Sequence, residues 1–437
     1  MKHHANILRA RPTRRHLLRS MAAVGVAAPF AGGLSSPALA QQRKIKIAIL
    51  SSISGPRAGF AECSEWMRDR VASQFADGLT IDGQTYEIEF ILKDTQTSAD
   101  RAGSLGKDLV LRDQVDMVLA DDPDSHYTVA PLCDQMGIPY VTTMISWDQF
   151  LDTRGSNPEK GFPWSFDFFW SGPDLGATFV AQWEKVKTSK IFGDTYVDHP
   201  TSVGFSDIKT GIPGQAIAKG YTRSDGGWFK LDTDDFSTQI NAWKRDDVSI
   251  LTGFVYPPHF AILHNQAAQL GLRPDVVSMA GAFLFPSGLE AVGETADGMS
   301  TEVWWTPAVP FTSSINGETA REVADAYTAE TGRQWTQPIG YVHSLYEVGI
   351  AALKNSGDPK NPEAIRDALR NMNLDTLVGP VNFRDSKIAN VAATQIAMGQ
   401  WRRTQDGPFP FDLYITDNTL APDIVPEREL VLLSELG

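Results

Sequence analysis

Short apolar runs alternate with amphipathic stretches along most of the chain. A first apolar run covers residues 44–50, and the stretch after it places apolar side chains at helical spacing, at Phe60, Cys63, Met67, Val71 and Phe75. Further strand-like runs are expected at 86–92, 115–119 and 138–142, and helices at 98–112 and 127–136. Strands separated by helices at short intervals predict an α/β protein with a parallel, doubly wound sheet.

The same alternation restarts after a Gly/Pro-rich stretch at 155–163. The pattern predicts strands at 190–196, 248–253 and 276–281, and helices at 175–186, 206–219, 235–244 and 258–270. A third section has helical patterns at 318–331, 340–355 and 362–371, and it closes with one strand-like run at 391–402. The two βα halves therefore predict two similar lobes.

The first forty residues have a different pattern. A basic start that includes Arg14 and Arg15 precedes an apolar stretch at 21–34, and a small-x-small site follows at Ala38 and Ala40. These three parts are typical of a secretory signal, and the arginine pair indicates the twin-arginine pathway. A membrane anchor is the weaker interpretation, because a spanning helix needs about 20 apolar residues. We expect cleavage after Ala40, residues 1–40 being the signal peptide, and a mature protein in the periplasm.

Charge excludes two classes of partner. Six of the 39 Lys and Arg residues lie in the first forty positions, so 33 basic residues face 53 acidic ones in the mature chain, a formal charge of −20. Such a chain is repelled by nucleic acid and by anionic lipid. Its length suits two lobes of about 150–200 residues each.

The sequence lacks the common catalytic and cofactor motifs. It contains no GxSxG, Walker, GxGxxG or HExxH pattern, and its two cysteines, Cys63 and Cys133, form no CxxC pair. We expect free, buried thiols, because their helices fall on opposite faces of the predicted sheet. The acidic run 121–126 is read as a helix cap rather than a metal site, and 232–235 lacks the Gly and Glu of a calcium loop. We expect no metal and no cofactor.

Five short motifs in a fixed order carry a resemblance. They are Ser54-Gly55-Pro56, Asp235-Phe236-Ser237-Thr238, Leu270-Gly271, Ala296-Asp297-Gly298 and Val378-Gly379-Pro380-Val381. In this order the chain resembles the periplasmic solute-binding proteins of branched-chain amino-acid-type ABC transporters, which are related to the leucine/isoleucine/valine-binding protein. The resemblance implies a type I periplasmic-binding fold, with two Rossmann-like lobes joined by a three-strand hinge. It places 41–165 with 306–375 in the N-lobe, and 166–305 with 376–437 in the C-lobe.

The resemblance also implies that a ligand binds in a cleft between the lobes, at the carboxyl ends of the strands. Matching the family's binding loops, together with the rings nearby, gives a set of candidate contacts. They are Phe60, Asp124, Ser125, His126, Tyr127, Thr143, Met144, Ser146, Trp147, Phe205, Tyr256, His259 and Phe283.

One position departs from the family. Its amino-acid binders use an acidic residue after the strand that here ends at Gly281, whereas this chain continues with 282–285, Ala-Phe-Leu-Phe. A buried ammonium group without a partner is unfavourable, so an ordinary α-amino acid fits poorly unless Asp124 supplies the acid from the other lobe. The aromatic candidates favour an aromatic acid, an amide or a urea-like compound.

The sequence thus predicts the substrate-binding component of an ABC uptake transporter. We expect a monomer without enzymatic activity that captures a small polar or aromatic solute and delivers it to an inner-membrane permease. Two alternatives remain open, an exported cofactor enzyme and a ligand sensor of the amide-receptor type. Catalytic residues that converge only in space would escape motif searches.

Overall fold

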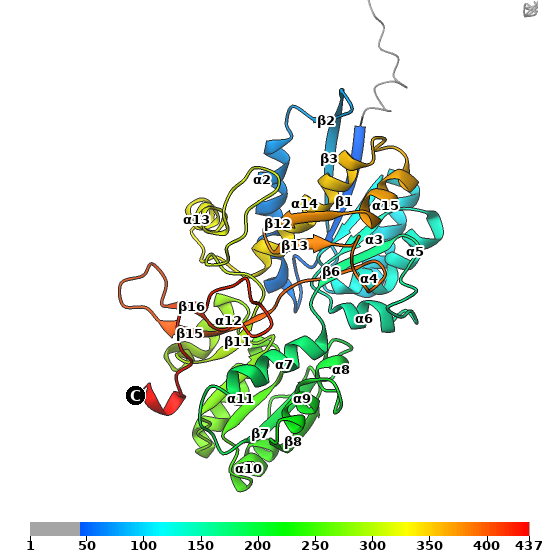
Figure 1. Cartoon of the computed structure of the whole chain (residues 1–437). Helices are drawn as coiled ribbons and strands as arrows, with labels where there is room; N and C mark the ends of the chain where they lie inside the picture. The colour runs from blue at the N-terminus through cyan, green and yellow to red at the C-terminus, as the bar shows by residue number, and fades with distance from the viewer. Residues whose placement is uncertain (1–43, 437) are drawn as a thin grey trace, which may run out of the picture. The chain divides into compact units, whose positions relative to one another are not determined.

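A computed structural model describes residues 44–436 (Figure 1). The predicted signal residues Arg14, Arg15, Ala38 and Ala40 lie outside the described residues. Residues 44–436 form one compact unit, which contains two seven-stranded sheets and one two-stranded sheet.

The first lobe is built on a sheet with the strand order β14-β6-β5-β4-β1-β3-β2. Every neighbouring pair is parallel except β2 with β3. This confirms the predicted parallel, doubly wound sheet. Its strands are β1 (Lys44–Ser51), β2 (Leu79–Ile81), β3 (Gln84–Asp94), β4 (Met117–Ala120), β5 (Tyr140–Thr142), β6 (Ser165–Phe169) and β14 (Val391–Ala393).

Helices of this lobe come from both ends of the chain. The early ones are η1 (Ala58–Ala61), α2 (Ser64–Gln74), α3 (Ala99–Lys107) with the π-helical turn η2 (Asp108–Asp113), α4 (Pro123–Thr128), α5 (Ala130–Met136) and α6 (Trp147–Asp152). The later ones are α13 (Ala320–Thr331), α14 (Pro338–Asn355) and α15 (Pro362–Arg370), followed by the hairpin β12 (Asn373–Thr376) and β13 (Gly379–Asn382).

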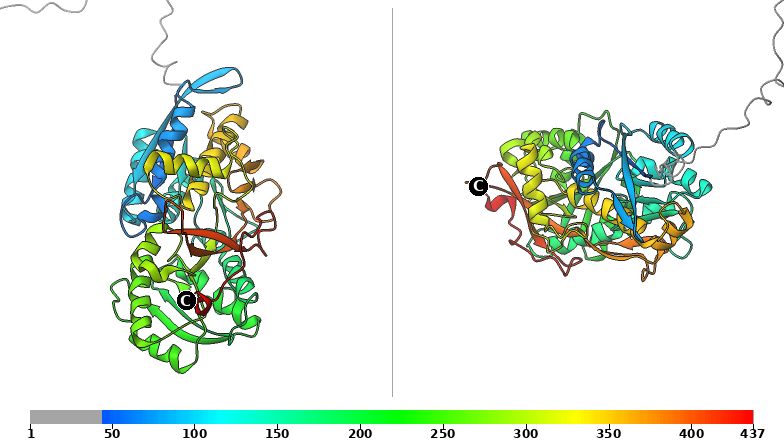
Figure 2. Two further views of the ribbon diagram at one scale, coloured as in Figure 1. Left: turned by 90° about the vertical axis from the view of Figure 1, so that its left-hand side faces the viewer. Right: turned by 90° about the horizontal axis from the view of Figure 1, so that it is seen from above.

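The second lobe has the strand order β16-β15-β11-β10-β9-β7-β8. Its strands are β7 (Ile191–Val197), β8 (Thr222–Phe229), β9 (Ile250–Phe254), β10 (Val276–Ala280), β11 (Ser300–Val303), β15 (Ala397–Arg403) and β16 (Phe411–Asp417). Its helices are α7 (Gly172–Trp183), α8 (Ser202–Phe205), α9 (Ile212–Ala218), α10 (Ser237–Arg245), α11 (Pro257–Leu270), α12 (Pro286–Val292), η3 (Gly293–Ala296) and η4 (Leu433–Glu435). Only β15 and β16 run antiparallel to their neighbours, and they lie where the lobes meet (Figure 2).

The chain passes between the two sheets three times: after β6, after β11 and after β14. The last passage differs from the predicted boundary at 375/376, because Val391 pairs with Asp167 of β6 and so belongs to the first sheet. The predicted single strand at 391–402 is in fact two strands, β14 in the first sheet and β15 in the second. The link at 394–396, Thr-Gln-Ile, is short and contains no Gly or Pro to mark the break.

The two cysteines lie on opposite faces of the first sheet. Side chains alternate along a strand, so Ile47 of β1 packs in one buried cluster with Cys63, whereas Ala48 packs in another with Cys133. Both thiols are buried and unpaired within the described residues, which confirms the prediction. No helix among residues 44–436 is long and apolar enough to cross a membrane.

Candidate functional site

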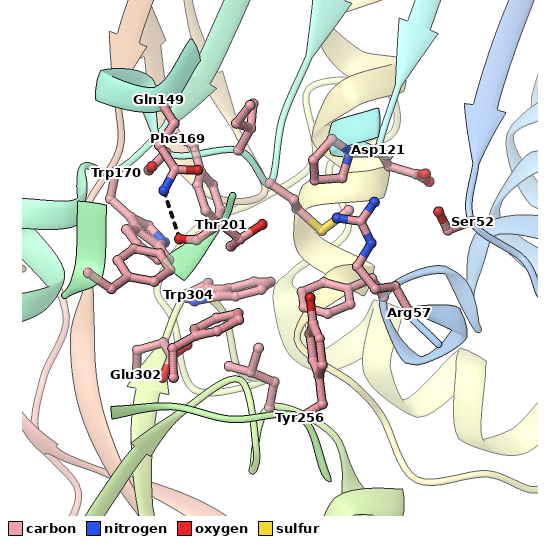
Figure 3. Close-up of a pocket in the computed structure, with 18 residues that line it drawn as sticks. Ser52, Arg57, Asp121, Gln149, Phe169, Trp170, Thr201, Tyr256, Glu302 and Trp304 are labelled. Atoms are coloured by element: carbon pink, nitrogen blue, oxygen red, sulfur yellow. Dashed lines mark hydrogen bonds between the residues drawn. The ribbon is translucent and has the colours of Figure 1, made fainter. Parts of the chain in front are cut away.

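A cavity of about 50 Å³ lies between the lobes, at the carboxyl ends of strands from both sheets (Figure 3). Loops after β1, β4 and β5 form the wall on the first lobe, and residues at or after β7, β9 and β10 form the opposite wall. Residues at two of the three passages between the lobes complete the lining. The lining residues are Ser52, Arg57, Phe60, Asp121, Pro123, Met144, Ile145, Ser146, Gln149, Phe169, Trp170, Thr201, Phe205, Phe254, Tyr256, Leu284, Glu302 and Trp304.

Aromatic rings make up much of the lining. The Trp304 ring is central, with centroid distances of 5.2 Å to Phe169, 5.9 Å to Phe60 and 6.0 Å to Trp170. Rings at these separations attract one another beyond their buried area. The cavity therefore has a preformed apolar surface suited to a flat or cationic group.

The side-chain amide of Gln337 holds the segment that carries Trp304. The backbone N–H of Trp304 donates to Oε1 of Gln337 at 2.7 Å, and Nε2 of Gln337 donates to the Glu302 carbonyl at 3.0 Å. Gln337 immediately precedes α14 of the first lobe. Because residues two apart on an extended segment point the same way, Glu302 and Trp304 both face the cavity.

An ion-paired cluster forms the polar wall. Arg57 is 5% exposed, and its Nη2 lies 2.6 Å from Asp124 and 3.2 Å from Asp122. Ser52 donates to the same Asp122 at 2.9 Å. Burial raises the pKa of Asp124, although the positive charge of Arg57 opposes this. Burial alone would lower the pKa of Arg57, but the nearby negative charges, chiefly Asp122 and Asp124, together outweigh it, so the pKa of Arg57 is raised. The short distances support an ion pair, so Asp124 is engaged by Arg57.

Two more carboxyl groups of the lining are buried. Asp121 accepts a hydrogen bond from Ser64 at 2.9 Å, and Glu302 accepts one from Thr301 at 2.8 Å. Burial raises the pKa of each group to about 7, against smaller opposing effects of these hydroxyl groups. Both groups therefore sit near the midpoint of their titration at neutral pH.

Five of the candidate residues from sequence line this cavity, and eight do not. The five are Phe60, Met144, Ser146, Phe205 and Tyr256. The eight are Asp124, Ser125, His126, Tyr127, Thr143, Trp147, His259 and Phe283.

The hydroxyl groups of Ser125 and Thr143 are used inside the first lobe. Ser125 donates to Asp122 at 3.1 Å, and Asp122 also accepts the backbone N–H of Asp124 at 3.2 Å, which confirms the interpretation of 121–126 as a helix cap. Thr143 donates to the Phe168 carbonyl at 2.8 Å. Neither hydroxyl is directed at the cavity.

The other predicted rings do not line the cavity, and His126 and Phe283 are fully buried. The centroid of the His126 ring lies 4.7 Å from that of Phe150, and burial lowers the pKa of His126 to about 3. Trp147 and Tyr127 pack at the edge of the same cluster. In the second lobe, His259 Nε2 is 2.9 Å from the Leu231 carbonyl oxygen, and Phe283 packs 4.5 Å from Phe260. Matching the family's binding loops, together with the rings nearby, did not distinguish the rings that line the cavity from those that do not.

Sequence reasoning missed Arg57, Trp170, Glu302 and Trp304. Arg57 directly follows the Ser54-Gly55-Pro56 motif, so a buried basic residue after the first strand was a usable signal. The other three lie at passages between the lobes, and no local pattern marks such a passage.

A hydrogen bond between two residues of the lining links the lobes. Nε2 of Gln149, on α6, donates to the Thr201 carbonyl of the second lobe at 2.8 Å, as the dashed line in Figure 3 shows. Within the described residues, the donors Trp170 Nε1, Trp304 Nε1 and Ser146 Oγ have no partner although they are buried. Unpaired buried donors are unfavourable, and all three belong to residues that line the cavity.

Comparisons with known proteins agree with this architecture. A family model described as "Periplasmic binding protein" matches residues 44–408. A comparison with curated proteins finds no match.

Solved structures are similar over almost their whole length. A leucine-binding protein from Thermotoga maritima is 18% identical, with a TM-score of 0.68, and the match covers 86% of this chain and 99% of that one. A solute-binding protein of an ABC transporter from Rhodopseudomonas palustris, in complex with 3,4-dihydroxybenzoic acid, is 18% identical with a TM-score of 0.65 and covers 88% and 99%. The predicted type I fold, with its two lobes, is thereby confirmed, and the chain belongs to the periplasmic binding protein family.

Proposed function

We propose that this protein is the substrate-binding component of an ABC uptake transporter. It captures a small polar or aromatic solute between its two lobes, and the closed form is what an inner-membrane permease recognises. Closure stabilises the bound state only as far as the solute contacts both lobes.

One observation carries this proposal: a ring-lined cavity takes its lining from both lobes and from two of the passages that join them. The Gln149–Thr201 hydrogen bond between the lobes supports closure as the mode of capture. Related structures hold isoleucine in a Streptococcus pneumoniae transporter protein and 3,4-dihydroxybenzoic acid in the Rhodopseudomonas palustris protein. These complexes support both amino-acid-like and aromatic solutes as candidates.

The remaining parts of the proposal concern export and assembly. We propose that Arg14 and Arg15 direct the folded chain through the twin-arginine pathway, with cleavage after Ala40. The mature protein acts as a monomer and needs no cofactor. Replacing both arginines by lysine is expected to leave the precursor uncleaved in the cytoplasm, as measured by cell fractionation.

A thermal-shift screen of the mature protein tests the function directly. The library contains amino acids, aromatic acids, amides, ureas and amines, and a bound solute raises the melting temperature by mass action. Small-angle scattering with each hit is expected to show a more compact particle, because the lobes close. A library without any hit, or hits that leave the scattering unchanged, would contradict the proposal.

A further inference from the structure

The carboxyl group of Glu302 is buried at the cavity and has few hydrogen bonds. The residue is 1% exposed and lines the cavity (Figure 3). One oxygen accepts the Thr301 hydroxyl at 2.8 Å, and the other has only the Gly281 backbone N–H, at 3.4 Å. A contact of 3.4 Å is long for a hydrogen bond.

Glu347, another buried glutamate, shows how many hydrogen bonds a buried carboxylate of this protein can accept. It is also 1% exposed, but it accepts from the Ser314 backbone and hydroxyl at 2.5 and 2.8 Å, from Ser344 at 2.9 Å and from the Leu377 backbone at 2.9 Å. Glu347 is absent from the lining of the cavity. The poorly satisfied glutamate is therefore the one that a solute can reach.

Glu302 also has no cationic partner. Among the ion pairs of residues 44–436, none includes Glu302, whereas Arg57 is already paired with Asp122 and Asp124. The lining contains two acids, Asp121 and Glu302, and one arginine, Arg57. The carboxyl groups that pair with Arg57, those of Asp122 and Asp124, lie behind the lining. An anionic solute would have to compete with two carboxylates for Arg57, while a buried carboxylate without a counter-charge is unfavourable.

Aromatic rings continue from Glu302 around the cavity. Centroid distances are 6.0 Å from Trp304 to Trp170, 6.0 Å from Trp170 to Phe205 and 5.2 Å from Phe205 to Phe254. The Gly281 N–H faces Glu302. The Phe254 ring packs against Gly281 and so fills the space beside it. Ring faces attract cations, most strongly where water is excluded.

We propose that the solute carries a positively charged nitrogen group, an amine, amidinium or quaternary ammonium, which binds against Glu302 among these rings. The inference rests on the proposed function and narrows its substrate class. The unpaired donors Trp170 Nε1, Trp304 Nε1 and Ser146 Oγ are available to oxygen atoms elsewhere on the same solute.

Three ligands of nearly equal shape test the sign of the charge. Benzamidine is cationic, benzamide neutral and benzoate anionic at pH 8, and choline is compared with its neutral isostere 3,3-dimethylbutan-1-ol. Titration calorimetry on the full mature protein is expected to give each cation an affinity about 10- to 100-fold above its neutral counterpart, the range of a hydrogen bond to a charged group. Benzoate is expected to bind most weakly of the three.

Two variants then test whether Glu302 causes the preference for the cationic ligand. In Glu302→Gln the ratio of benzamidine to benzamide affinity is expected to fall to within about threefold, since the charge is gone but the shape remains. Glu347→Gln is the matched control, a buried glutamate outside the cavity, and it is expected to keep the full ratio. A ratio is independent of how much of either variant is folded.

A pH series with choline adds a second readout, because its charge is permanent. Burial raises the pKa of Glu302 to about 7, so choline affinity is expected to rise between pH 5 and 8 and to be flatter in Glu302→Gln. The other titratable groups of the lining are Arg57, Asp121 and Tyr256, with Asp122, Asp124 and His199 behind them. Asp121 also titrates near pH 7, so the loss of slope in the variant, rather than the slope itself, identifies Glu302.

Three results would overturn the inference. The first is binding of benzamide or benzoate at least as tight as that of benzamidine, and the second is an unchanged ratio in Glu302→Gln. The third is failure of both benzamidine and choline to bind. Whether another compound of the wider library then binds decides the proposed function separately.

Discussion

The two lobes face the cavity with different chemistry. The first lobe presents a polar wall in which Ser52, Arg57 and Asp121 are each held by hydrogen bonds or ion pairs. The second lobe presents mainly Phe205, Phe254, Tyr256 and Leu284, which contribute area but few directed bonds. Directed groups fix orientation, whereas apolar area adds free energy without direction. Discrimination between solutes therefore belongs to the first lobe and the passages, and the second lobe supplies the closing surface.

The largest expected effect comes from removing the cation of the polar wall. Arg57→Ala leaves Asp122 and Asp124 buried without a counter-charge, which is expected to lower the free energy of unfolding by about 3–5 kcal/mol. Urea unfolding at pH 7 measures this. Arg57→Lys, which keeps the charge but loses the planar geometry, should lose less. An Arg57→Ala variant as stable as the parent would mean that the ion pairs do not hold the wall.

The two buried glutamates are expected to respond in opposite directions. The pKa of Glu302 is raised from its ordinary 4.5 to about 7, so its contribution to stability is complete below about pH 4.5 and is lost as the pH rises through 7. Glu302→Gln should therefore be more stable than the parent at pH 8, by about 1–3 kcal/mol, and similar to it at pH 4.5. Glu347→Gln should be less stable at pH 8, because four hydrogen bonds are disturbed. Thermal unfolding of both variants at pH 4.5 and pH 8 measures these changes. If both variants gained or both lost stability at pH 8, the predicted difference between the two glutamates would be wrong.

Substitutions of Tyr256 and Trp147 compare a residue that lines the cavity with one that packs outside it. Both were candidate contacts, but only Tyr256 lines the cavity, while Trp147 packs at the edge of a buried cluster. Tyr256→Ala is expected to weaken solute binding by at least about 1–2 kcal/mol. Trp147→Ala should leave affinity nearly unchanged and lower the melting temperature instead. Calorimetry and thermal unfolding on the same two variants decide, and a reversed pattern would move the binding surface towards α6.

The smallest effect concerns the hydrogen bond between Gln149 and Thr201. Gln149→Ala removes the hydrogen bond to the Thr201 carbonyl, which is worth about 0.5–1.5 kcal/mol. Because this bond forms only when the lobes meet, solute affinity should fall by that amount, mostly through faster dissociation. Stopped-flow dissociation measures it, and an unchanged rate would show that the bond does not contribute to closure.

Much of the fold was predictable because its signals are local. Periodicity gave the alternation of strands and helices in both lobes, and the topology predicted from it placed the helices of the two cysteines on opposite faces of the sheet, as observed. Strands β2, β6, β8, β11 and β16 were among those missed: β8 is largely polar, and β2 and β11 have only three and four residues. Tertiary pairing, rather than local pattern, makes these segments strands.

The site was predictable only where loops follow strands. Phe60 and Tyr256 were found in this way, because strand ends of both sheets converge on the cavity. Trp170, Glu302 and Trp304 belong to the site because the chain changes sheets beside them, and that depends on pairings such as β14 with β6 that lie more than 200 residues apart. A motif carried over from relatives cannot indicate such positions.

The amide of Gln337 has a mechanical consequence. By binding the backbone on both sides of Val303, it ties β11 of the second sheet to the start of α14 of the first lobe. A rotation of the second lobe must therefore pivot near this point, so Glu302 and Trp304 move less than Phe205 and Phe254, which lie farther along the second lobe. A solute thus rests against residues beside the pivot and is enclosed by residues that travel farther.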